Sequence, residues 1–433
     1  MDPERPTHFS LLKRSEQAHK NQLYVRIRFK ASFQNTMLQN EHSEVKMDAA
    51  TDIVVVGCIN TDLVSFVPRL PSVGETVFSD ALETHFGGKG ANQAAQAALL
   101  MQFRDAPSET LFHECAFSGS CQSAEGALRE NGAAAATLVD NASLDAAKRR
   151  TPICGVAMVG RVGRDIAGLS FIRHFHSLGI ETRGISMDSD KRTGTALVTV
   201  AHGGENTIAY VPGANASLSR EHITVEPAVS LLRNAKVVVS ENGIPGEISV
   251  ECFRIAKEGN SQVMTIFTPA PVDRVNPEIC CFTDFLLCNS VEARLLVKIW
   301  GNESIASETN VEEIARQLHE VILRTASKFP QGLRGRANVV ITQGSQPCVL
   351  FANERIVQVP VAKTVPSELV VDTTGAGDSF AGSLAYFLLK MPASPELAVS
   401  RATFVAAQSV TKKGAAESYT GKRDLPDHLF QPQ

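Results

Sequence analysis

Short runs of β-branched residues recur along the chain and alternate with helical stretches. Such runs are typical of buried strands, and a helix between successive strands allows the strands to run parallel. The expected strands are residues 53–56, 155–160, 237–239, 263–267, 285–288 and 339–342, and the expected helices include residues 91–101, 168–178, 248–257 and 291–300. This alternation predicts a doubly wound α/β fold, with a mostly parallel sheet flanked by helices on both faces.

Two segments interrupt the alternation and predict a second, smaller sheet. Residues 61–86 alternate polar and apolar side chains without a helical period, and residues 193–211 have the pattern of a hairpin. Its turn is expected at Gly203 and Gly204, because paired glycines between two alternating runs favour a tight turn. We expect these strands to form a small β-sheet that lies over the larger sheet as a lid.

Other stretches lie outside this pattern. Residues 1–50 are polar without an apolar period, and we interpret them as an N-terminal extension without a fixed fold. A basic targeting segment is the alternative, although acidic residues near the start are atypical of one. Residues 102–150 are rich in Ala, Ser and Glu and are interpreted as a surface insertion, and residues 301–336 as a polar peripheral element. The folded domain is then expected to span residues 51–425, followed by a tail at 426–433.

Composition narrows the class of function. The 433 residues include 42 Lys and Arg against 46 Asp and Glu, a formal net charge of −4, so no basic excess favours nucleic acid as a partner. No apolar run approaches the roughly 18 residues that a membrane span needs. The nine cysteines are scattered without a CxxC pair, which favours a reducing compartment over a disulfide framework or zinc site. We therefore expect neither nucleic acid nor membrane as partner, and take the cytoplasm as the default location.

The most specific motif is DTTGAGDSF at residues 372–380. Apolar residues follow it at helical spacing, so Gly375, Ala376 and Gly377 are expected to open a helix. Glycines let backbone N–H groups approach an anion, and the helix N-terminus adds partial positive charge. Asp378 in the first turn suits a general base that takes a proton from a hydroxyl attacking a phosphoryl group. The Walker A pattern and the dinucleotide fingerprint are both absent from the chain, so a different phosphate-binding solution is needed.

Two further motifs predict a site for a polyol. The string FGGKGANQA at residues 86–94 combines glycines with donors from Lys89 and Asn92, although a turn before a helix is the alternative. The string NTD places Asn60 and Asp62 just after the first strand, at the edge of the sheet where α/β folds bind ligands. Taken alone, an Asx turn explains that second string equally well.

The string NSVE supplies Asn289 and Glu292 where a strand gives way to a helix. Hard oxygen ligands of this kind suit Mg²⁺, which keeps several waters and binds substrate phosphates. A capping box, with Asn289 as N-cap and Glu292 at the third helical position, is a competing interpretation that does not exclude the first.

Together these strings resemble the PfkB-type carbohydrate kinases, and among them the ribokinase group most closely. The resemblance covers residues 51–100 and 153–425, and includes PGAN at residues 212–215 after the lid hairpin. It implies phosphorylation of D-ribose at its 5-hydroxyl by Mg-ATP, with Asp378 as general base and Glu292 acting on Mg²⁺ through water. It also implies a sugar site made by Asn60, Asp62, Gly88, Lys89 and Asn92. Nucleotide and phosphate contacts are implied for Asn289, Thr342, Gly344, Gly375, Ala376, Gly377 and Thr403.

The same resemblance implies a monovalent cation, K⁺, beside the anion-binding loop, and a homodimer formed through the β lid. The implied cation ligands, several of them through backbone carbonyls, are Asp372, Thr374, Ser409, Lys412, Gly414 and Ser418.

One departure from the family pattern concerns the sugar. Where the family has a glutamate that contacts the sugar, this chain has Gly243, with Glu241 and Asn242 just before it. The preferred sugar is therefore open, and a kinase for another small sugar or a nucleoside is the alternative. A sugar-binding module without turnover is a further alternative, against which Asp378, Asn289 and Glu292 argue.

Overall fold

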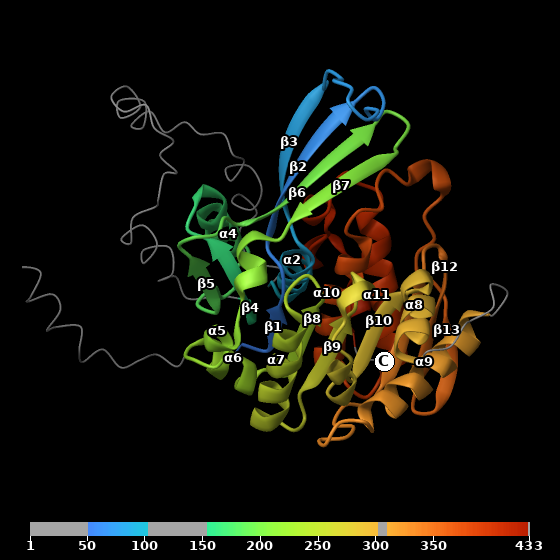
Figure 1. Cartoon of the computed structure of the whole chain (residues 1–433). Helices are drawn as coiled ribbons and strands as arrows, with labels where there is room; N and C mark the ends of the chain where they lie inside the picture. Colours follow the sequence, from blue (N-terminus) through green and yellow to red (C-terminus); the bar gives the residue numbers. More distant parts are fainter. Residues whose placement is uncertain (1–50, 103–153, 302–309, 432–433) are drawn as a thin grey trace, which may run out of the picture. The chain divides into compact units, whose positions relative to one another are not determined.

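The computed structural model describes residues 51–102, 154–301 and 310–431 (Figure 1). The predictions for residues 1–50 and for the insertion from residue 103 onward lie outside these described residues. Within them, two sheets and a set of helices form the fold, as the sequence predicts. No helix among them is both long and apolar enough to cross a membrane.

Nine strands of the described chain form the main sheet. Seven of them, from β11 to β5, run parallel, and β12 and β13 are antiparallel additions at one edge. The spatial order is β13 (Arg355–Val359), β12 (Gln346–Ala352), β11 (Asn338–Gln343), β10 (Phe285–Asn289), β9 (Met264–Thr268), β8 (Val237–Glu241), β1 (Ile53–Val56), β4 (Val156–Gly163) and β5 (Ile185–Asp188).

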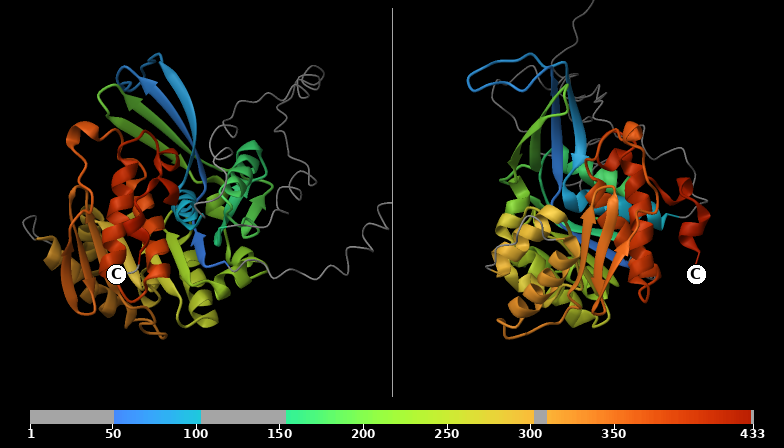
Figure 2. Two further views of the ribbon diagram at one scale, coloured as in Figure 1. Left: turned by 180° about the vertical axis from the view of Figure 1, so that it is seen from behind. Right: turned by 90° about the vertical axis from the view of Figure 1, so that its right-hand side faces the viewer.

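Helices cover both faces of this sheet and make it a three-layer structure (Figure 2). Successive residues of β1 point to opposite faces: Ile53 and Val55 join one hydrophobic cluster, and Val54 and Val56 join the other. The first cluster is closed by α2 (Lys89–Met101), α4 (Ile166–Ser177), α10 (Ala376–Lys390) and α11 (Pro395–Ser409). The second is closed by α5 (Arg220–Ile223), α6 (Ala228–Asn234), α7 (Gly246–Gly259), α8 (Ser290–Gly301) and α9 (Val311–Ala326).

The predicted lid is a separate four-stranded sheet that projects from one end of the main sheet (Figure 1). Its order is β3 (Ala81–Gly87), β2 (Asn60–Val67), β6 (Gly194–Ala201) and β7 (Asn206–Val211). Neighbours along the chain pair antiparallel, whereas β2 and β6 pair parallel across the centre of the lid. The first strand of the lid follows β1 after only three residues, so the lid starts at the carboxyl edge of the main sheet.

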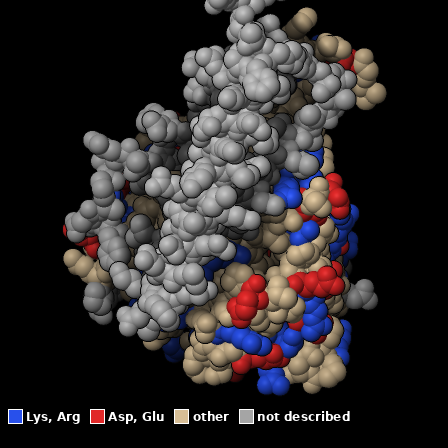
Figure 3. Space-filling view, turned by 90° about the vertical axis from the view of Figure 1, so that its left-hand side faces the viewer, with Lys and Arg blue, Asp and Glu red and all other residues tan. Residues whose placement is uncertain are grey.

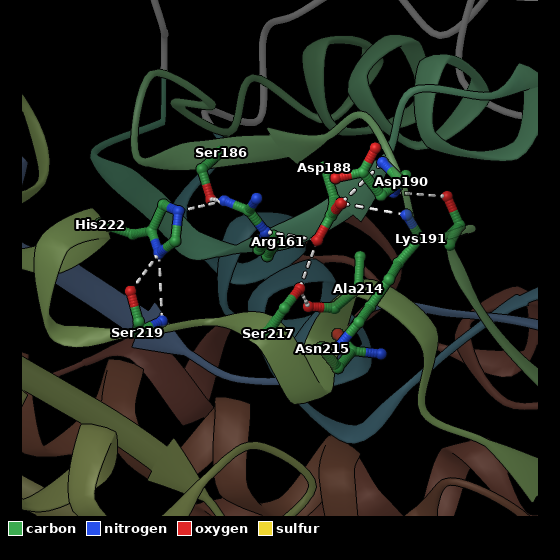
Figure 4. A network of polar contacts seen from close by, with 12 residues as sticks. Arg161, Ser186, Asp188, Asp190, Lys191, Ala214, Asn215, Ser217, Ser219 and His222 are labelled. Atoms are coloured by element: carbon green, nitrogen blue, oxygen red, sulfur yellow. Dashed lines mark hydrogen bonds and ion pairs between the residues drawn. The ribbon is translucent and has the colours of Figure 1, made fainter.

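A polar network at the base of the lid holds the chain where it enters and leaves the β6–β7 hairpin (Figure 4). Arg161 on β4 donates through Nε to Oδ2 of Asp188 at 3.1 Å. The same oxygen accepts the hydroxyl of Ser217, in η2 (Gly213–Ser217), at 2.5 Å. The other oxygen, Oδ1, accepts the backbone N–H groups of residues 190 and 191. One buried carboxylate therefore fixes both hairpin connections.

Two regions that the sequence predicts to be peripheral contribute buried residues to the core. The segment expected to be peripheral contains α9, whose Ile314, Leu318 and Ile322 are almost fully buried. The packed chain also continues past residue 425, because Leu429 is buried and the ring of Phe430 packs against Phe387. On the face shown in Figure 3, the described Lys, Arg, Asp and Glu side chains are interspersed, in keeping with the near balance of charges in the sequence.

Candidate active site

The loop before α10 is shaped to present backbone N–H groups at a helix N-terminus. Gly375, its N-cap, has φ of 75°, and a Cβ there would lie 2.8 Å from both Cβ of Ala415 and the hydroxyl of Tyr419. That hydroxyl donates to the carbonyl of Gly375 at 2.9 Å. A Cβ on Gly377 would meet no atom within 4 Å, so this residue faces open space. Positive φ and lack of room both require glycine at 375.

Asp378, in the first turn of α10, is held by two amides from the neighbouring helix α2. Its Oδ2 accepts from Nδ2 of Asn92 at 3.1 Å, and its Oδ1 accepts from Nε2 of Gln93 at 3.0 Å. The oxygens of those two amides, Oδ1 of Asn92 and Oε1 of Gln93, are buried without a partner among the described residues. Two unpaired acceptors therefore lie directly beside the predicted base.

Lys89 is the first residue of α2, and its ammonium group lies among acidic side chains. The neighbouring Asp378 raises the pKa of Lys89 despite its burial, with smaller contributions from Cys58, Glu241 and Glu292. Its position depends on Gly88, whose φ is 94° and whose Cβ would lie 2.7 Å from the carbonyl of Cys58. The chain thus brings a cation and the predicted base together at one point.

Two adjoining cavities lie over the carboxyl edge of the sheet. The larger, about 510 Å³, is lined by six of the residues predicted to contact the nucleotide: Asn289, Thr342, Gly344, Ala376, Gly377 and Thr403. The smaller, about 210 Å³, shares Asn289, Thr342 and Gly377 with it, and is also lined by Lys89, Glu292, Gly375 and Asp378. The predicted base, the anion-binding loop and the predicted magnesium residue therefore face one space that adjoins the larger cavity.

Asn289 and Glu292 form a reciprocal capping box at the start of α8. Oδ1 of Asn289 accepts the backbone N–H of Glu292 at 2.9 Å, and Oε2 of Glu292 accepts the backbone N–H of Asn289 at 3.0 Å. The structure thus confirms the capping interpretation. Because both side chains also line the smaller cavity, this cap does not exclude a role toward a hydrated cation.

Asn60 and Asp62 begin β2, outside the lining of the two cavities. Oδ1 of Asn60 accepts from Nδ2 of Asn215 at 2.8 Å, and the hydroxyl of Tyr210 lies 3.4 Å from it. The carboxylate of Asp62 lies against Gly87, where a Cβ would be 2.1 Å from Oδ2. Burial, followed by the nearby Glu417, raises the pKa of Asp62 to about 6.

Glu241 does not reach into the site in place of the missing family glutamate. Its fully buried carboxylate accepts the backbone N–H groups of Cys58 and Gly243, each at 2.6 Å. Burial raises the pKa of Glu241 to about 7. A Cβ on Gly243 would lie 2.6 Å from Oε2 of Glu241 and 2.7 Å from Sγ of Cys58. The Glu241 side chain and the thiol therefore occupy the space in which a side chain at 243 would begin.

The predicted cation ligands are only partly brought together. The carboxylate of Asp372 accepts the backbone N–H groups of Thr374 at 2.9 Å and Gly414 at 3.0 Å, and these bonds outweigh burial and lower its pKa. The hydroxyls of Ser409 and Ser418 instead donate to carbonyls three residues earlier. Lys412 is exposed, and its backbone N–H donates to the carbonyl of Ser409. Among the described residues, no group of three or more His, Cys, Asp or Glu side chains is arranged to hold a metal ion.

Three residues of the site received no role in the sequence analysis. Gln93 binds Asp378, Asn215 orients Asn60, and Tyr419 holds the carbonyl of Gly375. Gln93 lies in the string at residues 86–94 and Asn215 in the string at residues 212–215, so both motifs could have indicated a role for them. No motif indicated Tyr419, because its partner is 44 residues away in the sequence.

Comparison with known proteins places this site in a family. Residues 132–421 match the model of the pfkB family carbohydrate kinases. A mouse ribokinase is 33% identical over 387 residues, which cover 88% of this chain and 96% of that protein. The chain therefore belongs to the pfkB family of carbohydrate kinases. It is a kinase, a phosphotransferase, as the sequence predicts.

Solved structures agree with this assignment. A ribokinase from Thermotoga maritima superposes with a TM-score of 0.63 at 27% identity, over 86% of this chain and 97% of that one. A ribokinase from Arabidopsis thaliana, solved with ribose and ATP, gives a TM-score of 0.62 at 26% identity, over 86% of this chain and 96% of that one. The predicted α/β fold with its small lid sheet is thus confirmed as ribokinase-like.

Proposed function

We propose that this kinase transfers the γ-phosphoryl group of ATP to the 5-hydroxyl of D-ribose. One observation carries the proposal: Asp378 lies at the N-terminus of α10, on the wall of a cavity that adjoins the larger one lined by the predicted nucleotide residues. Its contacts with Asn92 and Gln93 come from the helix that begins with the predicted sugar residues. The base therefore lies between the proposed acceptor and donor sites. The mouse relative is called a ribokinase, which supports ribose as the acceptor.

In the proposed reaction, Asp378 takes the proton of the attacking hydroxyl. The exposed backbone of Gly377 and the N-terminus of α10 then stabilise the charge that develops on the transferring phosphoryl group. The nearby carboxylate of Asp378 raises the pKa of Lys89. The ammonium group therefore stays charged and contributes to the same stabilisation. On the sugar side, the carboxylate of Asp62 and the amide of Asn60 are proposed to bind the remaining hydroxyls.

Two cations are part of the proposal. Glu292 lines the smaller cavity with a carboxylate that is not fully used by its cap, and such hard oxygen donors fit a hydrated Mg²⁺. Bound with ATP, Mg²⁺ would offset the negative charge of the phosphates.

For K⁺, the donor set of Asp372 and nearby backbone carbonyls is likewise all oxygen. Its proposed place, beside Gly414 and Thr374, would hold the anion-binding loop in shape.

We also propose a homodimer through the lid. Every residue of β7 is exposed, and β7 is an edge strand that pairs only with β6 within the described chain. Ile208 and Val211 on it are 63% and 53% exposed. An exposed apolar edge strand favours pairing with another chain. Sedimentation of the wild type and of Ile208→Lys tests this: the variant should be monomeric, whereas Val225→Lys, at an exposed valine outside the lid, should not change the state.

The deciding experiment measures ADP release with Mg-ATP and a panel of sugars and nucleosides. The panel includes D-ribose, 2-deoxy-D-ribose, D-fructose and adenosine, each with and without K⁺. Ribose should give the highest kcat/KM, and K⁺ should raise it. Asp378→Asn should lose kcat by about a thousandfold or more while still binding ribose in calorimetry. Asp424→Asn, at an exposed aspartate in the C-terminal region, is the matched control.

Gly243 gives one alternative a specific basis. Because Gly243 has no side chain, and Glu241 and Cys58 fill the space beside it, a sugar contact available to a glutamate there is missing. If another sugar or a nucleoside outperforms ribose, the role of Asp378 stands and the ribose assignment fails.

A further inference from the structure

A charged cluster joins the lid to the turn that follows α11. His85, on β3, lies with Nδ1 3.2 Å from Oε1 of Glu417 and with Nε2 3.0 Å from Oε2 of Glu83. Glu417 belongs to η6 (Ala416–Ser418), the segment that also contains a proposed cation ligand. Lys413 completes the cluster, with Nζ 3.6 Å from Oε1 of Glu83. The imidazole is thus the link between two carboxylates on different parts of the fold.

This cluster borders the proposed sugar residue Asp62. Asp62 and His85 are register partners on the antiparallel strands β2 and β3, so their side chains share one face of the lid. The negative charge of Glu417 raises the pKa of Asp62, whereas the interaction with His85 lowers it. Without His85, the carboxylates of Glu83 and Glu417 would lose the group that lies between them. Lys413 contacts Glu83, and Lys89 favours the ionised form of Asp62, but within the described chain neither forms an ion pair with Glu417.

We propose that His85 is a positioning residue for sugar binding. It balances the charge of Glu417 beside Asp62 and fastens β3 to η6, so that the Asp62 carboxylate is held in place to accept sugar hydroxyls. The inference rests on the proposed function, because it takes Asp62 as the residue that binds the sugar. It assigns His85 no contact with the phosphoryl group, so its removal should weaken sugar binding more than turnover.

A mutant cycle tests this assignment. The variants are His85→Ala, His85→Gln, Glu417→Ala and the double variant His85→Ala/Glu417→Ala. Glutamine keeps a donor for Glu417 but carries no charge, so it separates hydrogen bonding from charge balance. His202→Ala is the matched control, because His202 also pairs with an acid, Asp80, at 2.9 Å, but at an exposed site in the lid. Thermal unfolding of each variant checks that it folds.

The first readout is the KM of whichever panel sugar the wild type phosphorylates, together with kcat and the KM of ATP. His85→Ala should raise the sugar KM about tenfold, and kcat and the KM of ATP should change less than about twofold. His85→Gln should raise the sugar KM less, because its amide can still donate to Glu417. The double variant should recover part of the lost affinity, because the unbalanced Glu417 charge is gone while the tie between β3 and η6 stays broken. His202→Ala should match the wild type.

The second readout is amide hydrogen exchange in peptides that cover residues 81–87 and 416–418. Both segments should exchange faster in His85→Ala, and neither should in His202→Ala. The inference is overturned if the sugar KM stays within twofold of wild type, or if the double variant is as weak as His85→Ala. If the wild type phosphorylates no sugar of the panel, the proposed function fails. The exchange experiment still tests whether His85 fastens β3 to η6. Faster exchange in His85→Ala would support that role, and unchanged exchange would overturn it.

Discussion

Nε2 of Gln93 lies 3.0 Å from Oδ1 of Asp378, although 285 positions separate the two residues in the sequence. The bond joins the N-terminal parts of α2 and α10, which pack together in the first hydrophobic cluster. One of these helices begins with the proposed sugar residues and the other with the anion-binding loop. The orientation of the proposed base is therefore set by the helix on the acceptor side.

Replacing Gln93 by alanine should lower kcat about tenfold, because Asp378 loses one of the two amides that hold it while its own side chain remains. The KM of the sugar should change far less. Gln102→Ala is the control, since the amide of Gln102 donates to the carbonyl of Leu178 at the far end of the same helix, away from Asp378. Steady-state kinetics of both variants are the measurement, and an unchanged kcat in Gln93→Ala would rule out this role.

Gly375→Ala should reduce kcat/KM by more than about a hundredfold, because a Cβ at φ of 75° would collide with Ala415 and Tyr419 and displace the loop. The backbone strain should also cost about 1–3 kcal/mol of stability. Gly203→Ala provides the comparison, since a Cβ there meets no atom within 4 Å. Kinetics and urea unfolding of both variants decide the matter. Wild-type turnover in Gly375→Ala would contradict the proposed loop geometry.

The KM of the sugar should depend on pH through Asp62. Its pKa, raised to about 6 by burial and by Glu417, means that the carboxyl group is ionised above that pH and neutral below it. A neutral carboxyl loses its charge and part of its accepting capacity, so KM should be lowest above about pH 6 and rise as the pH falls through it. Measuring KM from about pH 5 to about pH 8 tests this. Asp62→Asn should bind weakly at every pH, and a persisting acid limb in that variant would assign the titration to another group.

Asp188→Ala should lower the free energy of unfolding by about 3 kcal/mol, because it leaves the largely buried Arg161 without its ion-pair partner. It also removes the acceptor for Ser217 and for the backbone of residues 190 and 191. Asp273→Ala breaks an exposed pair with Arg274 and should cost less than about 1 kcal/mol. Urea unfolding measures both. Equal costs would mean that the network at the lid base contributes no more than a surface pair.

The sequence predicted the parts of the fold whose pattern is local. The β-branched runs located the central parallel strands, and paired glycines located the turn of the β6–β7 hairpin. The edge strands β12 and β13 were not predicted, because no helix separates them from β11 or from each other, so the strand–helix alternation does not reveal them. The sequence predicts a peripheral element where helix α9 lies, because the many charged residues of this segment conceal the spacing of its apolar ones. Ile314, Leu318 and Ile322 lie on one side of the helix, and this side is buried.

For the site, the motifs located the residues but left their partners open. The string around Asn289 predicted two roles, and the geometry confirms the capping role directly. The sequence does not predict the position of the Glu241 carboxylate. Whether it enters the site or turns back depends on the backbone N–H of Cys58, which lies in the connection after another strand, β1. Contacts of this kind follow from how helices and strands cross, which no local pattern encodes.

The parallel pairing of β2 with β6 has a consequence for how the molecule assembles. Asn60 pairs with Gly194, and β4, β5, α2 and α4 of the main body all lie between them in the sequence. Neither antiparallel pair of the lid is a complete sheet by itself, so the four strands can join only after the body has brought the two hairpins together. The lid should therefore be among the last parts to form during folding. Because the chain crosses between lid and body four times, the finished sheet is tied to the body at four points and should tilt as one piece.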